Sequence, residues 1–260
     1  MEASRLVRSF TLIINWKTYV LTLLAVLCSY LCFTFGLTAK FPDMLVGVAI
    51  VFPVVFSIGS AYNRRETALQ RWADFRGHAI AIYYATRDWP SDQNNDLAER
   101  TRELTTEMVH KTKELLTLKN KDKWEKKEEE FYQLFSKLSH ITMEMRKYGV
   151  QSGEISRVSQ YLSKMVIAFD NLKIIFQYRT PITLRTYSKV FIYVFPIIYG
   201  PYFASTFHDF SASLEYVMPI LYSFILVSLD NIQDHLEDPF DQVGEDDINI
   251  DANETIRLLV

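Results

Sequence analysis

Two uncharged stretches decide the fold: Thr18–Ala39 (TYVLTLLAVLCSYLCFTFGLTA) and Met44–Asn63 (MLVGVAIVFPVVFSIGSAYN). Each stretch is about 20 residues or longer, and a helix of that length spans the roughly 30 Å hydrocarbon core of a bilayer. Charged residues flank both stretches: Lys17, Lys40, Asp43 and Arg64. We therefore predict that both stretches are transmembrane helices.

Two further apolar runs lie in the second half of the chain. Val190–Phe207 contains Pro196 and Pro201, so we expect it to cross the membrane as a kinked helix. Tyr216–Leu229 reaches a spanning length when it is extended back to Phe210. With these two runs, the sequence predicts an all-α membrane protein with four crossings.

The basic residues are distributed unevenly around the four runs. Of the 28 Lys and Arg residues, 27 lie in the segments 1–17, 64–189 and 208–260. The positive-inside rule places such segments in the cytoplasm. We therefore expect a multi-pass integral protein of the cell membrane, with both termini cytoplasmic. No small-residue cleavage site follows the first run, so we expect the first helix to stay in the protein.

The middle of the chain is predicted to be a cytosolic helical domain. Trp89-Pro90 and the pair Gly149 and Gly153 interrupt it, which gives three helical blocks. Two apolar series within these blocks recur at spacings of three and four residues: Phe131, Leu134, Leu138, Ile141, Met145 and Tyr148, and then Ile155, Val158, Leu162, Met165, Phe169, Leu172 and Phe176. Such narrow seams indicate packing of helix against helix.

The sequence thus divides into four regions: 1–63 with the first two crossings, 64–188 as the cytosolic helical domain, 189–229 with the last two crossings, and 230–260 as an acidic cytosolic tail. The net charge is +6 over 64–189 and −11 over 208–260. Because opposite charges attract, we expect the tail to lie along the basic domain. We expect no nucleic-acid partner.

Motifs for enzyme chemistry were sought and are missing. The sequence contains no GxGxxG, P-loop, HExxH, CxxC or GxSxG motif, and its five histidines lack ligand spacing. Cys28 and Cys32 lie one turn apart inside the first crossing, where small apolar packing is the ordinary role of a thiol. We expect neither an enzyme nor a bound cofactor.

Four stretches, in order along the chain, resemble the bestrophin family of pentameric ion channels, including its bacterial members: Tyr62–Arg76 (YNRRETALQRWADFR), Gly153–Ser156 (GEIS), Arg179–Phe191 (RTPITLRTYSKVF) and Ser228–Ile248 (SLDNIQDHLEDPFDQVGEDDI). In the first stretch, the matching residues are Arg71, Trp72, Asp74 and Arg76. In the third, Thr183 stands where the family has a second proline.

The resemblance implies a homopentamer with one central pore, embedded in membrane lipid, with a cytosolic helical vestibule. It implies passive flux of small monovalent ions, most often chloride and other anions, although some similar bacterial members pass cations. Alignment to the family places the pore neck on Phe52, Phe56 and Ser60, and the cytosolic aperture on Ile155.

The chain departs from the family pattern in three places that concern the site. Ser60 stands where a bulky apolar residue is usual, which would make the innermost neck ring wide and wet. About three extra residues between Gly59 and Arg71 leave a second neck register open, namely Val55, Gly59 and Asn63. After Pro239-Phe240 the sequence has only three consecutive acidic residues. The resemblance implies a longer acidic run at this place in animal members of the family, where it binds calcium. The three acidic residues of this chain are weak calcium candidates: Glu245, Asp246 and Asp247.

Physical chemistry agrees with an apolar neck. Phe52 and Phe56 lie on a crossing without ionisable residues, so a narrow ring of them could gate only by drying. Two other classes stay open. A carrier would show broken helices and a polar site at the membrane midplane, and a membrane-anchored helical interaction protein would need no pore.

Overall fold

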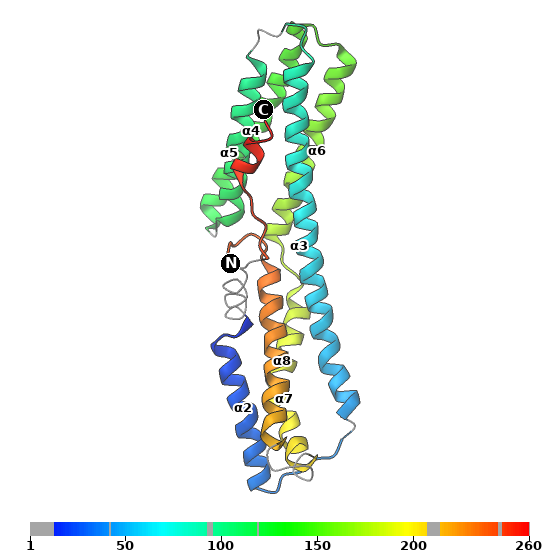
Figure 1. Ribbon diagram of the computed structural model, residues 1–260, viewed down its shortest axis with the longest axis vertical. Coiled ribbons are helices and arrows are strands. Elements are labelled where there is room, and N and C mark those ends of the chain that lie inside the picture. The colour runs from blue at the N-terminus through cyan, green and yellow to red at the C-terminus, as the bar shows by residue number, and fades with distance from the viewer. Residues whose placement is uncertain are drawn as a thin grey trace. The chain divides into compact units, whose positions relative to one another are not determined.

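A computed structural model describes residues 13–41, 43–92, 96–118, 120–206, 214–243 and 246–259. Within these ranges every regular element is a helix: α2 (Trp16–Thr34), α3 (Asp43–Asp88), α4 (Leu97–Thr117), α5 (Lys121–Glu144), η1 (Met145–Tyr148), α6 (Ser152–Gln177), α7 (Ile182–Thr206), α8 (Leu214–Glu237) and α9 (Ala252–Ile256). The all-helical fold class predicted from the sequence is therefore confirmed for the described residues. The helices are drawn in Figure 1.

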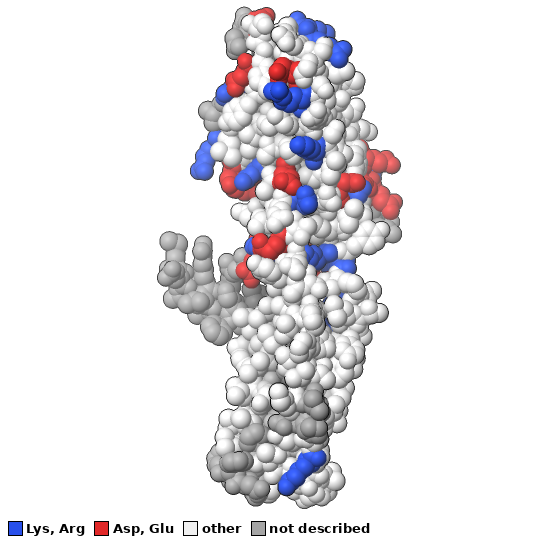
Figure 2. All heavy atoms as spheres, turned by 90° about the vertical axis from the view of Figure 1, so that its right-hand side faces the viewer, with Lys and Arg blue, Asp and Glu red and all other residues white. Residues whose placement is uncertain are grey.

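The chain forms two compact units, which we describe separately. The membrane unit comprises Met1–Arg65, Arg179–Pro239 and Val243–Asp246. The helical unit comprises Glu66–Tyr178, Phe240–Gln242 and Asp247–Val260. Figure 2 shows that on the face drawn most blue and red atoms belong to the helical unit, whereas the membrane unit is largely white.

In the membrane unit, α2, α7 and α8 pack against one another side by side (Figure 1). Gly200 of α7 allows a close approach to α2, because a Cβ at this position would lie 3.3 Å from the Cβ atom of Cys28 and 3.4 Å from the Sγ atom of Cys32. Small residues permit such contacts between membrane helices. The two cysteines therefore serve as packing residues against α7.

Three described helices are long and apolar enough to cross a membrane: α2 over Trp16–Thr34, α3 within Gly47–Asp88, and α8 over Tyr216–Glu237. They coincide with three of the predicted runs and indicate an integral membrane protein. α7 is not in this group. It contains Pro196, Pro201 and several tyrosines. These residues are only weakly hydrophobic and lower the mean hydropathy of the helix. The fourth crossing stays a prediction, and the connection 207–213 lies outside the described residues.

Helix α3 is continuous over 46 residues and belongs to both units. The sequence predicted a crossing that ends near Asn63, but the helix continues to Asp88. One side of α3 is buried along most of its length, at positions separated by three, four or seven residues: Ile50, Val54, Ser57, Ala61, Ala68, Trp72, Phe75, Ala79 and Ile82. This regular spacing keeps the buried side in register through both units.

The helical unit contains one more helix break than predicted. The middle block, expected to be one helix, is divided into α4 and α5. The break falls at Asn120, whose side chain accepts a hydrogen bond from the backbone N–H of Lys123 and so caps the start of α5. The sequence reasoning treated this polar stretch as a turn or helix end without dividing the block there.

Both predicted seams lie in the core of the helical unit. Phe131 of α5 stacks on Phe169 of α6 with 4.0 Å between ring centroids, and Phe75 of α3 lies 6.5 Å from the first ring and 6.3 Å from the second. Aromatic pairs of this kind add stability beyond the area they bury. The 3–4 spacing thus correctly indicated which residues pack together.

A polar cluster also joins α5 to α6. The Lys173 ammonium lies 2.8 Å from Asp170 and 2.9 Å from Glu128, and the Tyr132 hydroxyl donates to Asp170 at 2.7 Å. Burial lowers the pKa of Lys173, but its hydrogen bonds to Asp170 and Glu128 outweigh burial and raise the pKa overall. Hydrogen bonds from Lys173 and Tyr132 lower the pKa of Asp170.

The last part of the acidic tail, from Asp247 onward, packs on the helical unit of its own chain. Arg76 pairs with Glu254 at 2.8 Å, and the Tyr84 hydroxyl donates to the carbonyl of Leu258 at 2.8 Å. Three apolar tail residues are buried in the same core: Ile248, Ile250 and Ala252. Apolar burial therefore contributes to this contact, together with the attraction between the acidic tail and the basic domain that the sequence predicted.

Replacing the stacked ring tests this core. Phe169→Ala should lower the free energy of unfolding by about 3–5 kcal/mol, because deleting a buried ring leaves a cavity. Ile167→Ala is the matched control on the same helix, since Ile167 is 59% exposed, and it should change stability by less than about 0.5 kcal/mol. Denaturant unfolding of the purified chain measures both variants. Equal effects would contradict the assigned core.

Candidate functional site

The free side of α3 carries two contacting phenylalanines. Phe52 is 56% exposed and Phe56 is 61% exposed, and their ring centroids lie 5.8 Å apart. They point away from the buried side of α3, where Ile50 and Val54 pack into the membrane unit. The structure therefore brings two of the predicted neck residues together on a face that this chain leaves open.

The alternative neck register lies on much the same face. Val55 is also more than half exposed, and a Cβ built at Gly59 would have no heavy atom within 4 Å. Ser60 is half-buried, because each step of four residues turns the side chain by about 40° toward the packed side. A single subunit therefore presents Phe52, Val55, Phe56 and Gly59 together, and the choice of register stays a prediction.

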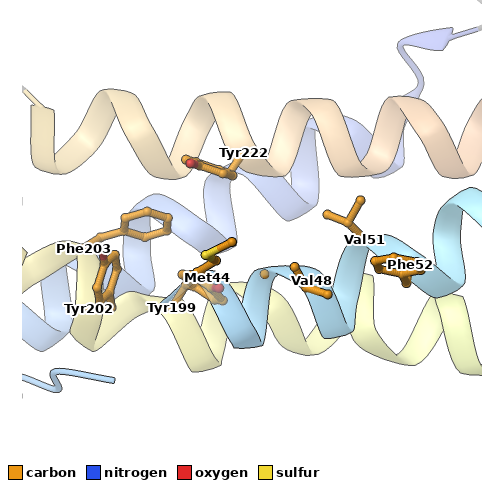
Figure 3. Close-up of a pocket in the computed structure, with 9 residues that line it drawn as sticks. Met44, Val48, Val51, Phe52, Tyr199, Tyr202, Phe203 and Tyr222 are labelled. Atoms are coloured by element: carbon orange, nitrogen blue, oxygen red, sulfur yellow. The ribbon is translucent and has the colours of Figure 1, made fainter. Parts of the chain in front are cut away.

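A cavity of about 460 Å³ adjoins Phe52 in the membrane unit (Figure 3). Three helices line it: α3 through Met44, Gly47, Val48, Val51 and Phe52, α7 through Tyr199, Tyr202 and Phe203, and α8 through Tyr222. None of these side chains is ionisable at neutral pH. The sequence reasoning missed this cavity, because its walls come from helices that are far apart along the chain.

Ile155, the predicted aperture residue, does not lie on a free surface. It is 2% exposed and belongs to the core of the helical unit. The first turn of α6 exposes Ser152, Gly153 and Ser156. The pore aperture on Ile155 stays a prediction.

The weak calcium candidates form no recognisable metal site. Glu245 lies outside the described residues. The backbone carbonyl of Asp246 accepts a hydrogen bond from the Nε atom of Arg65 at 2.9 Å. Among the described residues, no three His, Cys, Asp or Glu side chains are grouped so that they could hold a metal ion.

One end of the membrane unit is organised around a buried carboxylate. Glu237, at the end of α8, is 1% exposed, and its Oε1 atom accepts a hydrogen bond from the backbone N–H of Thr180 at 2.8 Å. Arg185 of α7 lies 4.0 Å from the same oxygen. The Nε atom of Arg64 donates to the Glu237 carbonyl at 3.0 Å. One residue of α8 thereby holds the start of α7 and a residue of α3.

The neighbouring turn of α8 connects to α2 in the same way. Asp234 pairs with Lys189 at 2.8 Å and with Lys17 at 3.5 Å. Asn15, the N-cap of α2, donates to the Asn231 side chain at 2.8 Å. Hydrogen bonds to charged groups are stronger than those between neutral groups. The neighbouring ends of α2, α7 and α8 are therefore linked by polar contacts.

These contacts join three of the four stretches whose sequence resembles the bestrophin family. Arg64 belongs to the first stretch, Thr180 to the third and Glu237 to the fourth. No structural role was predicted for them. The sequence carries one signal of this role, because Glu237 is an acidic residue at the end of an apolar helix. A carboxylate there needs partners from other elements.

No family model matches the chain, and no curated protein matches it in sequence. Solved structures do match. A single-residue variant of a bacterial bestrophin homologue from Klebsiella pneumoniae gives a TM-score of 0.80 at 16% identity, covering 94% of this chain and 95% of that chain. A second variant gives 0.75 at 17% identity, covering 94% and 97%. A structure of the homologue solved by Zn-SAD phasing gives 0.78 at 16%, covering 94% and 96%.

The chain has the bestrophin fold. The resemblance inferred from the four stretches is confirmed at this level. The likeness extends over nearly the whole chain, so the bestrophin fold includes both the membrane unit and the helical unit.

Removing the buried carboxylate tests its role in this bestrophin fold. Glu237→Ala should lower the free energy of unfolding by about 2–3 kcal/mol, because the Thr180 N–H loses its acceptor and Arg185 loses its acidic partner. Glu237→Gln should cost less, since an amide oxygen can still accept from Thr180. Asp238→Asn is the control, because its partner Arg179 is more than half exposed and exposed pairs contribute little. Thermal unfolding in detergent measures all three, and a loss with Asp238→Asn equal to that with Glu237→Ala would refute the assignment.

Proposed function

We propose that this chain is a member of the bestrophin family and forms a homopentameric ion channel in the cell membrane. It passes small monovalent ions, chloride and other anions, passively through one central pore. Each subunit contributes four crossings, and both termini and the helical unit lie in the cytoplasm. The observation that carries the proposal is the open apolar face of α3 at Phe52 and Phe56, in a chain with the bestrophin fold.

The proposed neck is a stack of apolar rings. If five copies of α3 surround the axis, Phe52 and Phe56 form two rings one turn apart. An ion that passes them loses water without gaining a charge or a dipole in exchange. Such a constriction controls conduction by drying, and it favours the ions that lose their water most easily. Large, weakly hydrated anions should therefore pass more readily than small ones.

Two alternative functions stay open beside this proposal. A cation-conducting bestrophin homologue would use the same fold and the same apolar neck, because the neck carries no charge of either sign. A membrane-anchored helical interaction protein would use the helical unit to bind a partner and would pass no current. The experiments below separate these alternatives.

Removing the two rings should increase conduction. In planar bilayers, Phe52→Ala/Phe56→Ala should raise open probability or conductance by about threefold or more, since a barrier lower by only about 0.7 kcal/mol gives that change. Phe52→Ala alone should act in the same direction with a smaller effect, because Phe56 still closes the path. Selectivity among anions should weaken in the double variant.

The alternative register provides the matched comparison. Val55→Ala and Gly59→Ala change the same face of α3 without touching the two rings. Currents that change with these variants and not with the double phenylalanine variant would move the neck to Val55, Gly59 and Asn63. If neither set alters the current, α3 does not line a pore.

Assembly can be measured independently of conduction. We expect the purified chain in mild detergent to have five times the subunit mass of 30.4 kDa. Native mass spectrometry or light scattering gives this number directly. A monomer or dimer that persists at all protein concentrations would contradict the channel.

Ion selectivity requires one further measurement. In asymmetric potassium chloride, an anion channel should reverse near the chloride equilibrium potential, and a cation channel near the potassium equilibrium potential. The first result supports the proposal, and the second assigns the cation-conducting alternative. A purified pentamer without current in any salt would favour the interaction protein.

A further inference from the structure

The cavity beside Phe52 has aromatic walls on several sides. Five of its nine lining residues are aromatic: Phe52, Tyr199, Tyr202, Phe203 and Tyr222. Tyr199 and Phe203 are almost fully buried and form the floor, whereas Phe52 and Tyr222 are about half exposed and form the rim. Figure 3 shows that these rings come from α3, α7 and α8.

The rings hold one another in different orientations. Tyr199 and Tyr202 are nearly perpendicular, at 77° with 5.8 Å between centroids. Phe203 lies 5.7 Å from Tyr199 and 5.9 Å from Tyr222. Phe41 packs behind the floor, with its ring 5.3 Å from Tyr199 and 5.1 Å from Tyr202. The aromatic rings around the cavity therefore differ in orientation, and those of Tyr199 and Phe203 are fixed by burial.

The remaining lining restricts the charge and size of a ligand. Met44, Gly47, Val48 and Val51 supply apolar surface, and the nine lining residues include no Lys, Arg or His that would repel a cation. They also include no carboxylate, which a strongly hydrated metal ion would need in exchange for its water. The volume of about 460 Å³ lies within the range of cavities that bind small molecules.

We propose that this cavity binds an organic ammonium ion with methyl or other alkyl groups on its nitrogen. Ring faces attract such cations, and cages of several aromatic side chains are the usual site for quaternary ammonium groups. A quaternary ammonium ion is weakly hydrated, so it can enter an uncharged cavity at a cost that the rings offset. The source can be a soluble ammonium compound or the choline headgroup of a lipid.

Two probes of the same shape separate cation binding from simple apolar binding. Choline and 3,3-dimethylbutan-1-ol differ only in a charged nitrogen against a neutral carbon. Titration of the purified full chain, in maltoside detergent and sodium phosphate buffer without other amines, should show choline binding at least about fivefold tighter. Equal or tighter binding of the neutral alcohol, or no binding of choline, would overturn the proposal.

Variants of Tyr222 connect that affinity to the rings. Tyr222→Leu should weaken choline binding about tenfold, because it removes a ring face and keeps apolar bulk. Tyr222→Phe keeps the ring and should stay within about twofold. Tyr30→Leu is the control, since Tyr30 is a half-exposed tyrosine of α2 outside the cavity. Unchanged affinity in a folded Tyr222→Leu, judged by its circular dichroism, would also overturn the proposal.

Reconstitution distinguishes the two sources of the ligand. In vesicles of phosphatidylethanolamine, soluble choline should bind as it does in detergent. Weaker apparent binding in phosphatidylcholine vesicles would assign the cavity to a lipid headgroup, whereas equal binding would assign it to a soluble ammonium compound. The binding measurements do not depend on conduction, so the proposed channel and the proposed cavity ligand can fail separately.

Discussion

A segment inside a bilayer has to satisfy its backbone hydrogen bonds within itself, and this requirement shapes the molecule. It makes each apolar run a helix. α3 continues as the same helix beyond its apolar run, to Asp88. One side of α3 is packed in both units, so the opposite side is left for other contacts. Phe52 and Phe56, on which alignment to the family places the pore neck, lie on that open side.

Apolar packing alone would leave the ends of these helices without specific partners. Glu237 supplies one, because its side chain holds the start of α7 and its carbonyl holds Arg64 of α3. Asp234 adds Lys17 and Lys189. A buried carboxylate is costly unless it is paired, so such a residue specifies which helix ends meet. Hydrogen bonds and ion pairs therefore define this end of the membrane unit, whereas apolar packing defines its interior.

Some residues could be interpreted from the sequence and others could not. The 3–4 spacing of Phe131 and its seam partners identified core positions, because helix periodicity is a local property. Ile155 belongs to the same kind of series, yet alignment suggested a pore-lining role for it. Its side chain is buried in the helical unit, and a family alignment carries no information on which side of a turn is packed in this chain. The cavity at Tyr199 and Tyr222 has no local signature at all.

The sequence by itself determined that the chain enters a membrane, that its regular structure is helical, and that four ordered stretches resemble one family. Those properties depend on apolar length, periodicity and short motifs, all of which are local. Only the tertiary structure decided that α3 is one helix, that the tail adds Ile248 and Ile250 to the core, and that aromatic residues of three helices line a cavity. Those features depend on contacts between residues far apart in the chain, and no local pattern specifies which distant partner a side chain meets.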